Sequence, residues 1–343
     1  MTLPASIETE VQLEDLLSQP TQPSIEMFAR LPGDIIVLGA SGKMGKSLAR
    51  MAKRASDLAG SSRRVVGVAR FADGGREELE SHGIETIACD LLNEEHISRL
   101  PDAPHVVFMA GRKFGSTGDE PTTWAMNAWL PTLVCRRFRS SRIVAFSTGN
   151  VYGLTPVGDG GSRETDVPQP VGEYAMSCLG RERLFEFFSR SLEIPTAIIR
   201  LNYACDLRYG VLVDLAQQIE RGQPIDLAMG HFNTIWQGDA NAMALAAFEH
   251  VSNPPWVVNV TGPELLSVRS VGERLGELLG KPVHFVGSDS PTALLSDASR
   301  AIEHLGRPEV SADRLIEWVA AWIRRGGRTL DKPTHFESRS GEF

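Results

Sequence analysis

The stretch Ile35-Ile36-Val37-Leu38-Gly39-Ala40-Ser41-Gly42-Lys43-Met44-Gly45 sets the class of fold. An apolar run typical of a buried strand leads directly into a glycine-rich turn, and an amphipathic run follows it. Glycines permit a tight turn with close approach of the backbone to a ligand, and the helix N-terminus behind the turn favours a phosphate. This order is typical of the first βαβ unit of a dinucleotide-binding fold. The predicted dinucleotide contacts in the turn are Gly39, Ser41, Gly42, Lys43, Met44 and Gly45.

Short apolar runs alternate with longer amphipathic runs along most of the chain. Strands are expected over 35–38, 65–69, 84–88, 106–109, 143–146, 196–200 and 257–260, and helices over 43–58, 122–137 and 174–191. Most of these strands are continuously apolar, as strands buried on both faces of a parallel sheet are. The alternation therefore predicts an α/β fold with a doubly wound, Rossmann-type parallel sheet.

The rest of the chain predicts two additions to this sheet. Residues 1–33 hold two short amphipathic runs, the second with Ser24 as its expected N-cap, which predict a helical extension packed on the domain or on a partner subunit. Helical runs with little strand over 267–280 and 312–325 predict a small, mainly helical lobe. The predicted domains are the extension (1–33), an NAD(P)-binding Rossmann domain (34–204 plus 235–262) and a substrate-binding lobe (205–234 plus 263–343).

Composition excludes several classes of function. The 343 residues include 43 acidic and 35 basic ones, a net charge of −8, whereas nucleic-acid binders usually carry a basic surface. No window approaches the length of a membrane span, and the N-terminus lacks the pattern of a secretory signal. The four cysteines are scattered without metal-ligand spacing. We expect a cytoplasmic protein that binds no metal, nucleic acid or membrane.

Several motifs, met in order from residue 34 to about 330, resemble the extended short-chain dehydrogenase/reductase superfamily in its epimerase/dehydratase branch. They are the GxxGxxG spacing of the turn, Phe146-Ser147-Thr148-Gly149-Asn150-Val151-Tyr152-Gly153 at a strand end, Tyr174, Gly238-Asp239-Ala240 and Asn259-Val260-Thr261-Gly262. The resemblance implies that Tyr174 is the catalytic proton-transfer group and Thr148 its partner at the substrate oxygen. Hydride transfer at a carbinol needs such a group beside the nicotinamide.

The same resemblance implies further cofactor contacts. Asp90 and Leu91 correspond to the position that contacts adenine after the third strand. Ala110 and Gly111 correspond to the strand end beneath the ribose and nicotinamide, and Asn127 to the helix asparagine common in the family.

Cys178 is the main departure from the family pattern. It stands one helical turn after Tyr174, where the family has a lysine that favours the tyrosinate. A free tyrosine has a pKa near 10, so about a thousandth of it is ionised at pH 7. A thiol supplies no positive charge, so three interpretations stay open: a replacement cation, either Lys113 or Arg112; a tyrosine that acts as a neutral hydrogen-bond donor; or a protein without chemistry.

We predict an NAD(P)-dependent oxidoreductase or epimerase, with Lys113 as the replacement cation. The alternative is a catalytically inactive NADP-binding sensor or scaffold protein. We expect Cys178 itself to be a small buried residue rather than a nucleophile.

The residue that ends the second predicted strand bears on the choice of cofactor. An acidic residue there binds the ribose hydroxyls of NAD, whereas this strand ends in Arg70, which can take a 2′-phosphate with help from Lys43. Arg70 therefore favours NADP, while the nearby Asp73 leaves NAD open.

Phe232 occupies the place where family members that act on nucleotide-sugars carry an arginine. Without that bidentate cation for a diphosphate we expect a smaller carbohydrate-like substrate: a sugar, a polyol or a sugar acid. The predicted substrate contacts are Asn150, Asn202, His231, Asn233 and Trp236. Arg200 and Arg208 either bind a carboxylate or pair internally. The resemblance also implies a homodimer through the helices at 122–137 and 174–191.

Overall fold

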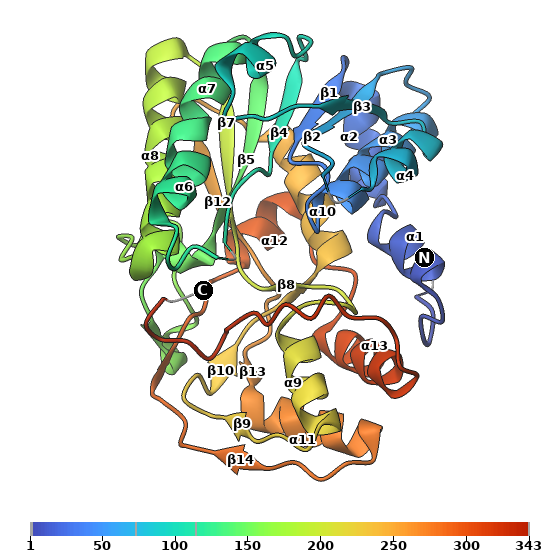
Figure 1. Ribbon diagram of the computed structural model, residues 1–343, viewed down its shortest axis with the longest axis vertical. Helices are drawn as coiled ribbons and strands as arrows, with labels where there is room; N and C mark the ends of the chain where they lie inside the picture. Colours follow the sequence, from blue (N-terminus) through green and yellow to red (C-terminus); the bar gives the residue numbers. More distant parts are fainter. Residues whose placement is uncertain (1–2, 73, 114, 342–343) are drawn as a thin grey trace.

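A parallel sheet of seven strands, in the order β12-β7-β5-β4-β1-β2-β3, forms the centre of the molecule (Figure 1). The computed structural model describes residues 3–72, 74–113 and 115–341. The strands are β1 (Ile35–Leu38), β2 (Val65–Ala69), β3 (Glu85–Ala88), β4 (His105–Phe108), β5 (Arg142–Thr148), β7 (Thr196–Leu201) and β12 (Trp256–Val260). Every strand expected from the sequence is present, so the predicted doubly wound parallel sheet is confirmed.

The direction of strand addition reverses next to β1. This strand pairs in parallel with β2 on one side and with β4 on the other, and Leu38 stands level with Val68 and Phe108. Such a switch point opens a crevice at the carboxyl ends of the strands, where ligands of doubly wound sheets bind. The glycine-rich turn follows β1 at this point.

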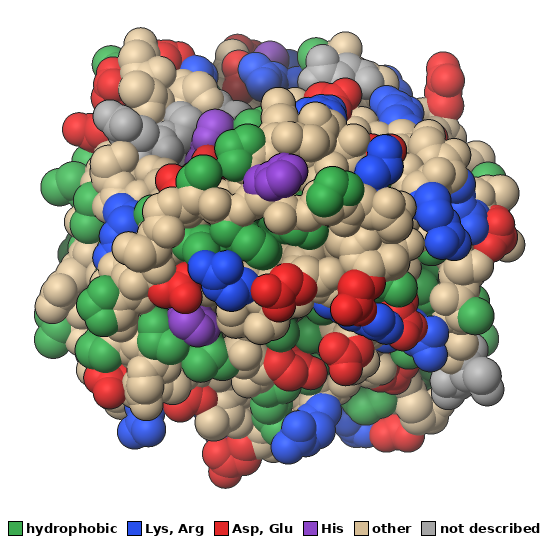
Figure 2. All heavy atoms as spheres, turned by 90° about the horizontal axis from the view of Figure 1, so that it is seen from below, with side chains coloured by type: hydrophobic (Ala, Val, Ile, Leu, Met, Phe, Trp, Pro, Cys, Tyr) green, Lys and Arg blue, Asp and Glu red, His purple; other side chains and the backbone are tan. Residues whose placement is uncertain are grey.

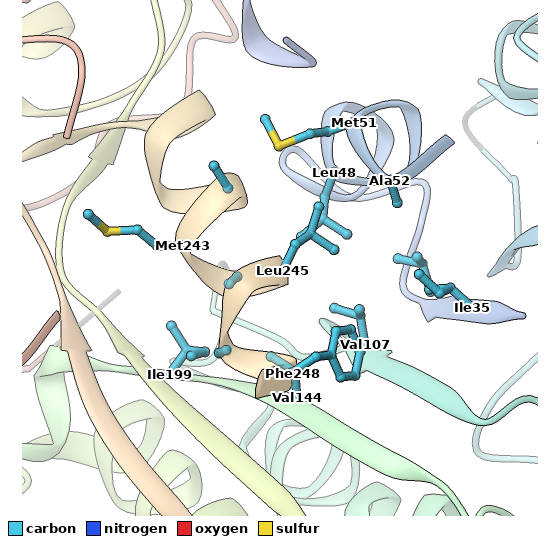
Figure 3. Packing of buried hydrophobic residues seen from close by; sticks show 14 of the residues in the cluster. Ile35, Leu48, Met51, Ala52, Val107, Val144, Ile199, Met243, Leu245 and Phe248 are labelled. Atoms are coloured by element: carbon cyan, nitrogen blue, oxygen red, sulfur yellow. The ribbon is translucent and has the colours of Figure 1, made fainter. Parts of the chain in front are cut away.

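Helices cover both faces of the sheet. One face carries α2 (Gln22–Arg30), α3 (Gly45–Leu58), α4 (Arg76–Ser81), α10 (Gln237–Ala246) and α12 (Ser299–Leu305). Figure 3 shows Leu48 of α3 and Leu245 of α10 meeting above the sheet residues Ile35 and Val107. The other face carries α5 (Glu94–Ser98), α6 (Glu120–Trp124), α7 (Leu130–Arg137) and α8 (Gly172–Leu192). Both faces are therefore apolar, as the continuous strand pattern predicts.

The helix expected over 122–137 is divided into three parts. A π-helical turn, η1 (Ala125–Trp129), separates α6 from α7, which has Pro131 in its first turn. Proline has no N–H, so the carbonyl of Asn127 loses the donor that a continuous α-helix would supply at this position. The π turn therefore lies where the sequence removes a backbone hydrogen bond.

A smaller lobe lies beneath the carboxyl edge of the sheet (Figure 1). Its helices α9 (Val211–Glu220), α11 (Val268–Leu279) and α13 (Ala312–Arg324) enclose a separate apolar cluster that includes Leu212, Leu275 and Trp318. The short strands outside the main sheet are β6 (Thr155–Pro156), β8 (Ala204–Cys205), β9 (Ile225–Asp226), β10 (His231–Phe232), β11 (Ile235–Trp236), β13 (Leu266–Ser267), β14 (Phe285–Val286) and β15 (Thr292–Ala293). Three-residue 3₁₀ turns occur at Gly149–Val151, Val157–Asp159 and Ala247–Glu249. On the face seen in Figure 2, acidic and basic side chains are interspersed.

The N-terminal extension touches both parts of the molecule. Leu13 and Leu17 of α1 (Glu10–Leu17) belong to the apolar cluster of the lobe, whereas Met27 and Phe28 of α2 belong to that of the sheet. The expected cap of the second helix is wrong: α2 begins at Gln22, and Thr21 accepts the N–H of Ser24. Thr21 is extended and a proline follows in the first turn, which places the cap three residues earlier.

The described helices include none with the length and apolar character needed to cross a membrane.

Candidate active site

A cavity of about 270 Å³ lies at the carboxyl ends of β1, β4 and β5, on the side of the small lobe. It is lined by Gly39, Gly42, Lys43, Met44, Gly45, Met109, Gly111, Arg112, Lys113, Phe146, Ser147, Thr148, Asn150, Tyr174, Arg181, Leu201, Tyr203, Ala204, Tyr209, Gly210, Val211, Gln237 and Thr334. The glycine-rich turn and the tyrosine singled out from the sequence therefore face one space.

The glycine-rich turn forms one end of this cavity from backbone alone. Gly39 has φ +99°, and a Cβ there would stand 2.8 Å from the nitrogen of Ala110. A Cβ on Gly45 would overlap the carbonyl oxygen of Gly39. The N–H of Gly45 donates to the carbonyl of Gly42, and no described side chain caps the first turn of α3, so the N–H groups that follow Gly45 are the ones suited to an anion. These features fit the pyrophosphate of a dinucleotide.

Lys43 reaches from this turn toward the lobe. Its Nζ lies 3.1 Å from the centroid of the Tyr209 ring. Desolvation, followed by the charges of Lys113 and Lys332, lowers the pKa of Lys43 to about 7, although part of the residue stays exposed. Lys43 and Lys113 both line the cavity.

Tyr174 and Thr148 meet at the opposite end. Tyr174 stands in the first turn of α8, Thr148 ends β5, and their side chains are hydrogen-bonded. The Thr148 hydroxyl also donates to Oδ1 of Asn150 at 2.9 Å. Burial, followed by the Cys178 thiol, raises the pKa of Tyr174 well above its usual range, and Arg181 and Thr148 oppose that rise.

Cys178 lies behind the tyrosine. It is fully buried and packs on Val151 and Tyr152, and burial raises the pKa of its thiol. A neutral packed thiol is what the sequence predicts for this position.

Arg181 is a site residue that the sequence interpretation missed. It lies on α8 two turns beyond Tyr174, is 6% exposed and lines the cavity. Its Nη1 donates to the carbonyl of Phe146 at 2.8 Å and its Nη2 to Oδ1 of Asn127 at 2.6 Å. Its Nε donates to the carbonyl of Asn127, which the π turn leaves without an α-helical donor. The spacing of Tyr174, Cys178 and Arg181 along one helix face is the signal that could have found it.

The predicted replacement cation also reaches the tyrosine. Nζ of Lys113 lies 5.8 Å from the centroid of the Tyr174 ring and donates to the carbonyl of Thr334 at 3.4 Å. Burial lowers the pKa of Lys113 to about 8. Arg112, the other candidate, instead pairs with Asp119 at 2.9 Å.

The remaining predicted cofactor residues line the carboxyl edge of the sheet. Arg70 directly follows β2 and is exposed, and Asp90 is exposed after β3 with Oδ1 accepting the N–H of Leu92. Leu91 and Ala110 are buried, and Gly111 lines the cavity. Oδ1 of Asn127 accepts the N–H of Arg112. Asp73 lies outside the described residues.

Of the predicted substrate contacts, Asn150 lines the cavity. Asn202 donates to Asn233, which donates to the carbonyl of Ser296, so both amides hold the lobe to the sheet domain. Trp236 is buried against Trp318, and His231 lies in the short β10–β13 pair.

Arg200 and Arg208, which the sequence left as either carboxylate-binding or internally paired, both form ion pairs within the protein. Arg200 meets Glu182 at 2.7 Å in a buried ion pair, and its Nη1 donates to the hydroxyl of Tyr152. Arg208 pairs with Asp206 at 2.8 Å and Glu14 at 2.6 Å.

The C-terminal segment 328–341 crosses between the sheet domain and the lobe and closes one side of the cavity (Figure 1). Thr334 donates from its N–H and its hydroxyl to Oδ2 of Asp214, at 2.8 and 2.6 Å. Phe336 is buried with its ring 6.1 Å from that of Phe232. Phe232 thus anchors this segment.

A profile of the NAD dependent epimerase/dehydratase family matches residues 35–228, more than half of the chain. The chain belongs to this family. It is therefore an enzyme of the NAD-dependent epimerase/dehydratase type, which uses a nicotinamide cofactor. A search of curated protein sequences finds no significant match.

Solved structures show the same fold at low identity. UDP-glucuronic acid 4-epimerase from Bacillus cereus in complex with NAD is 22% identical, with a TM-score of 0.70. UDP-glucose 4-epimerase from Thermotoga maritima with UDP-glucose is 19% identical, with a TM-score of 0.68. Each comparison covers 85% of this chain and 99% of the other. This chain thus carries residues beyond the fold it shares with them.

Proposed function

We propose that this enzyme oxidises or epimerises a small carbohydrate-like substrate by hydride transfer, with Tyr174 as the proton-transfer group. The observation that carries the proposal is that the cavity joins the glycine-rich turn to the hydrogen-bonded pair Tyr174 and Thr148. The bound nicotinamide accepts or supplies the hydride. Tyr174 takes or returns the hydroxyl proton, and Thr148, held by Asn150, orients the same oxygen.

The substrate is proposed to be a sugar, polyol or sugar acid rather than a nucleotide-sugar. Phe232 and Phe336 pack together where a diphosphate-binding arginine would serve a nucleotide-sugar, and Thr334 closes the adjoining side of the cavity. Asn150 is the substrate contact that this proposal retains, because it lines the cavity. The lobe formed by 205–234 and 263–343 is proposed to bind the substrate.

NADP is proposed as the preferred cofactor. Arg70 is exposed directly after β2, where it can reach a ribose 2′-phosphate, and Lys43 stands in the turn that would hold the pyrophosphate. The chain is also proposed to act in the cytoplasm, where its four free, buried thiols remain reduced.

A homodimer is proposed through α6, η1 and α8. Trp124, Trp129, Met176 and Phe187 on these elements expose 38%, 47%, 47% and 59% of their surface. Large apolar side chains gathered on neighbouring helices are typical of surfaces that a second protein covers. Sedimentation equilibrium tests the assembly: Trp129→Glu with Phe187→Glu is expected to give monomers, and an unchanged dimer would exclude this surface.

The experiment that tests the function measures turnover on a panel of sugars, polyols, sugar acids and nucleotide-sugars with NAD and NADP. Tyr174→Phe is expected to lower turnover at least about 100-fold while cofactor affinity stays within a few-fold, because general acid–base catalysis contributes about 10²–10⁴-fold. Glu186→Gln, which changes a surface ion pair on the same helix away from the cavity, is the control and should keep turnover. Preserved turnover in Tyr174→Phe with lost cofactor affinity would exclude the assigned role.

A further inference from the structure

The network around Arg181 suggests how the site works without the family's lysine. This inference rests on the proposed role of Tyr174 as the proton-transfer group. Cys178 is buried and uncharged, so the charge that favours the tyrosinate must come from another residue.

Arg181 is held at the bottom of the cavity by three acceptors. These are the carbonyl of Phe146, two residues before Thr148, and the carbonyl and side-chain oxygens of Asn127. All three acceptors are neutral, so the guanidinium charge is not cancelled by a carboxylate among them. A side chain on a helix points back toward the helix N-terminus, which directs Arg181 toward Tyr174.

Two features of the backbone make room for this guanidinium. A Cβ on Gly111 would overlap its Nη2, so a larger residue at this position would displace the guanidinium from where it now lies. Pro131 removes the donor for the Asn127 carbonyl, which Nε of Arg181 then supplies. The side-chain amide of Asn127 donates to the hydroxyl of Ser177, and that hydroxyl donates to the backbone carbonyl of Tyr174. The arginine is thereby linked to the turn that carries the tyrosine.

We propose that Arg181 takes the electrostatic place of the lysine that position 178 lacks, as a positioning residue that stabilises ionised Tyr174 during proton transfer. A guanidinium stays charged at every working pH. Lys113 is a weaker source of fixed charge, since burial lowers its pKa to about 8 and its ammonium donates to Thr334 of the C-terminal segment.

The ionisation of Tyr174 can be followed without substrate or cofactor. The chain has four tyrosines, so 3,5-difluorotyrosine labels four positions, and the ¹⁹F resonances of each are assigned by a Tyr→Phe variant. Fluorination lowers the pKa of a phenol, which moves the titration toward neutral pH. The charged and titratable groups that act on Tyr174 are Cys178 and Arg181 on α8 and, 5.8 Å from its ring centroid, Lys113 after β4. Glu182 of α8 acts in turn on Cys178, and Asp214 of α9 and Glu337 of the C-terminal segment act on Lys113.

Arg181→Met is expected to raise the titration midpoint of Tyr174 by about 1–2 pH units, a 10–100-fold loss of tyrosinate at fixed pH, because an opposite charge nearby shifts a pKa by about that much. Arg181→Lys should stay within about half a unit of the natural protein, and Arg181→Met with Cys178→Lys should return the midpoint toward that of the natural protein. Lys113→Met is the matched control and should move the midpoint less than Arg181→Met does.

An unchanged midpoint in folded Arg181→Met would overturn the inference, as would a larger shift in Lys113→Met. If circular dichroism shows Arg181→Met to be unfolded, Arg181→Lys decides, and a rise of more than one unit would count against the proposal. This readout is independent of turnover. An unmoved titration beside an inactive Tyr174→Phe rejects Arg181 alone, whereas an active Tyr174→Phe rejects the proposed function.

Discussion

The two ends of the cavity are built in different ways. The glycine-rich end is made of backbone: Gly39 and Gly45 stand where a Cβ would clash, within a few residues of one another. The tyrosine end is made of side chains from distant segments, with Arg181 held by Asn127 and Glu182 held by Arg200. The first end is predicted from a motif of consecutive residues, whereas the second contains Arg181, which the sequence interpretation missed. The difference indicates that the cofactor end is constrained by local backbone geometry, whereas the chemical end can be rebuilt through long-range pairs.

The largest expected effect tests the side-chain end. Glu182 and Arg200 are 4% and 6% exposed at the side chain, and Glu182 also accepts the hydroxyl of Ser147. Glu182→Gln should lower the free energy of unfolding by about 3–5 kcal/mol, because it leaves a buried guanidinium without its counter-charge. Urea denaturation measures this loss in the free energy of unfolding. The control is Glu249→Gln, which removes an exposed pair with Arg30 and should cost less than about 1 kcal/mol. Equal losses of stability in Glu182→Gln and Glu249→Gln would show that the buried ion pair contributes no more than the exposed one.

Asp239 of α10, which contacts the lobe, is expected to make the free energy of unfolding depend on pH. Burial raises the pKa of Asp239 to about 7, although its carboxylate accepts the N–H of Val310. The folded pKa lies above the unfolded one, so the folded state holds the proton more tightly and stability falls as the pH rises from about 4 to 7. Asp239→Asn should match the natural protein at pH 4 and exceed it by up to about 4 kcal/mol at pH 8.

Thermal unfolding across this pH range measures the effect. Asp297→Asn is a control of opposite sign: burial alone would raise the pKa of Asp297, but the hydrogen bonds of Ser299 and the Arg163 cation lower it. That variant should therefore lose stability at pH 8 relative to pH 3. A difference between Asp239→Asn and the natural protein that does not grow with pH would contradict the assignment.

The backbone end is tested by a single methyl group. Gly45→Ala places a Cβ against the carbonyl of Gly39 and should weaken dinucleotide binding by about 100-fold, roughly 3 kcal/mol, since the turn must shift. Isothermal titration with NADPH measures the affinity. Gly158→Ala, where a Cβ would meet only open space, should leave it unchanged. Retained affinity in Gly45→Ala would mean that the turn does not hold the pyrophosphate.

The smallest expected effect concerns the choice of dinucleotide. Arg70→Ala should weaken NADPH about tenfold and leave NADH within twofold, because a charge-assisted contact with the 2′-phosphate is lost. Arg64 precedes the same strand and pairs with Asp34 at 2.8 Å, so Arg64→Ala is the matched control and should affect neither cofactor. A parallel loss of both cofactors in Arg70→Ala would assign the arginine to folding rather than to cofactor choice.

The sequence predicts the cofactor end well because its signals are local. The apolar runs mark each strand of the sheet, and the turn between Leu38 and Gly45 needs its glycines for reasons visible in eleven consecutive residues. Thr148 ends β5 and Tyr174 stands in the first turn of α8, and the packing of α8 on β5 brings the two together.

The tyrosine end is less predictable because its partners are far apart in the chain. Asn127 and Arg181 meet only once α8 packs on the π turn at Pro131. The sequence predicts Trp236 as a substrate contact, yet it packs on Trp318 near the other end of the chain. The position of Thr334 over the cavity depends on the anchoring of Phe336 by Phe232, a contact that no local pattern encodes.

The most direct test of the account is a fluorescence titration of the protein with NADH and NADPH, run in parallel on Gly45→Ala. The account predicts saturable binding of at least one reduced dinucleotide, tighter for NADPH, and loss of that binding in the glycine variant. Absence of binding by either cofactor to the folded natural protein would contradict the central claim that this cavity holds a nicotinamide dinucleotide beside Tyr174.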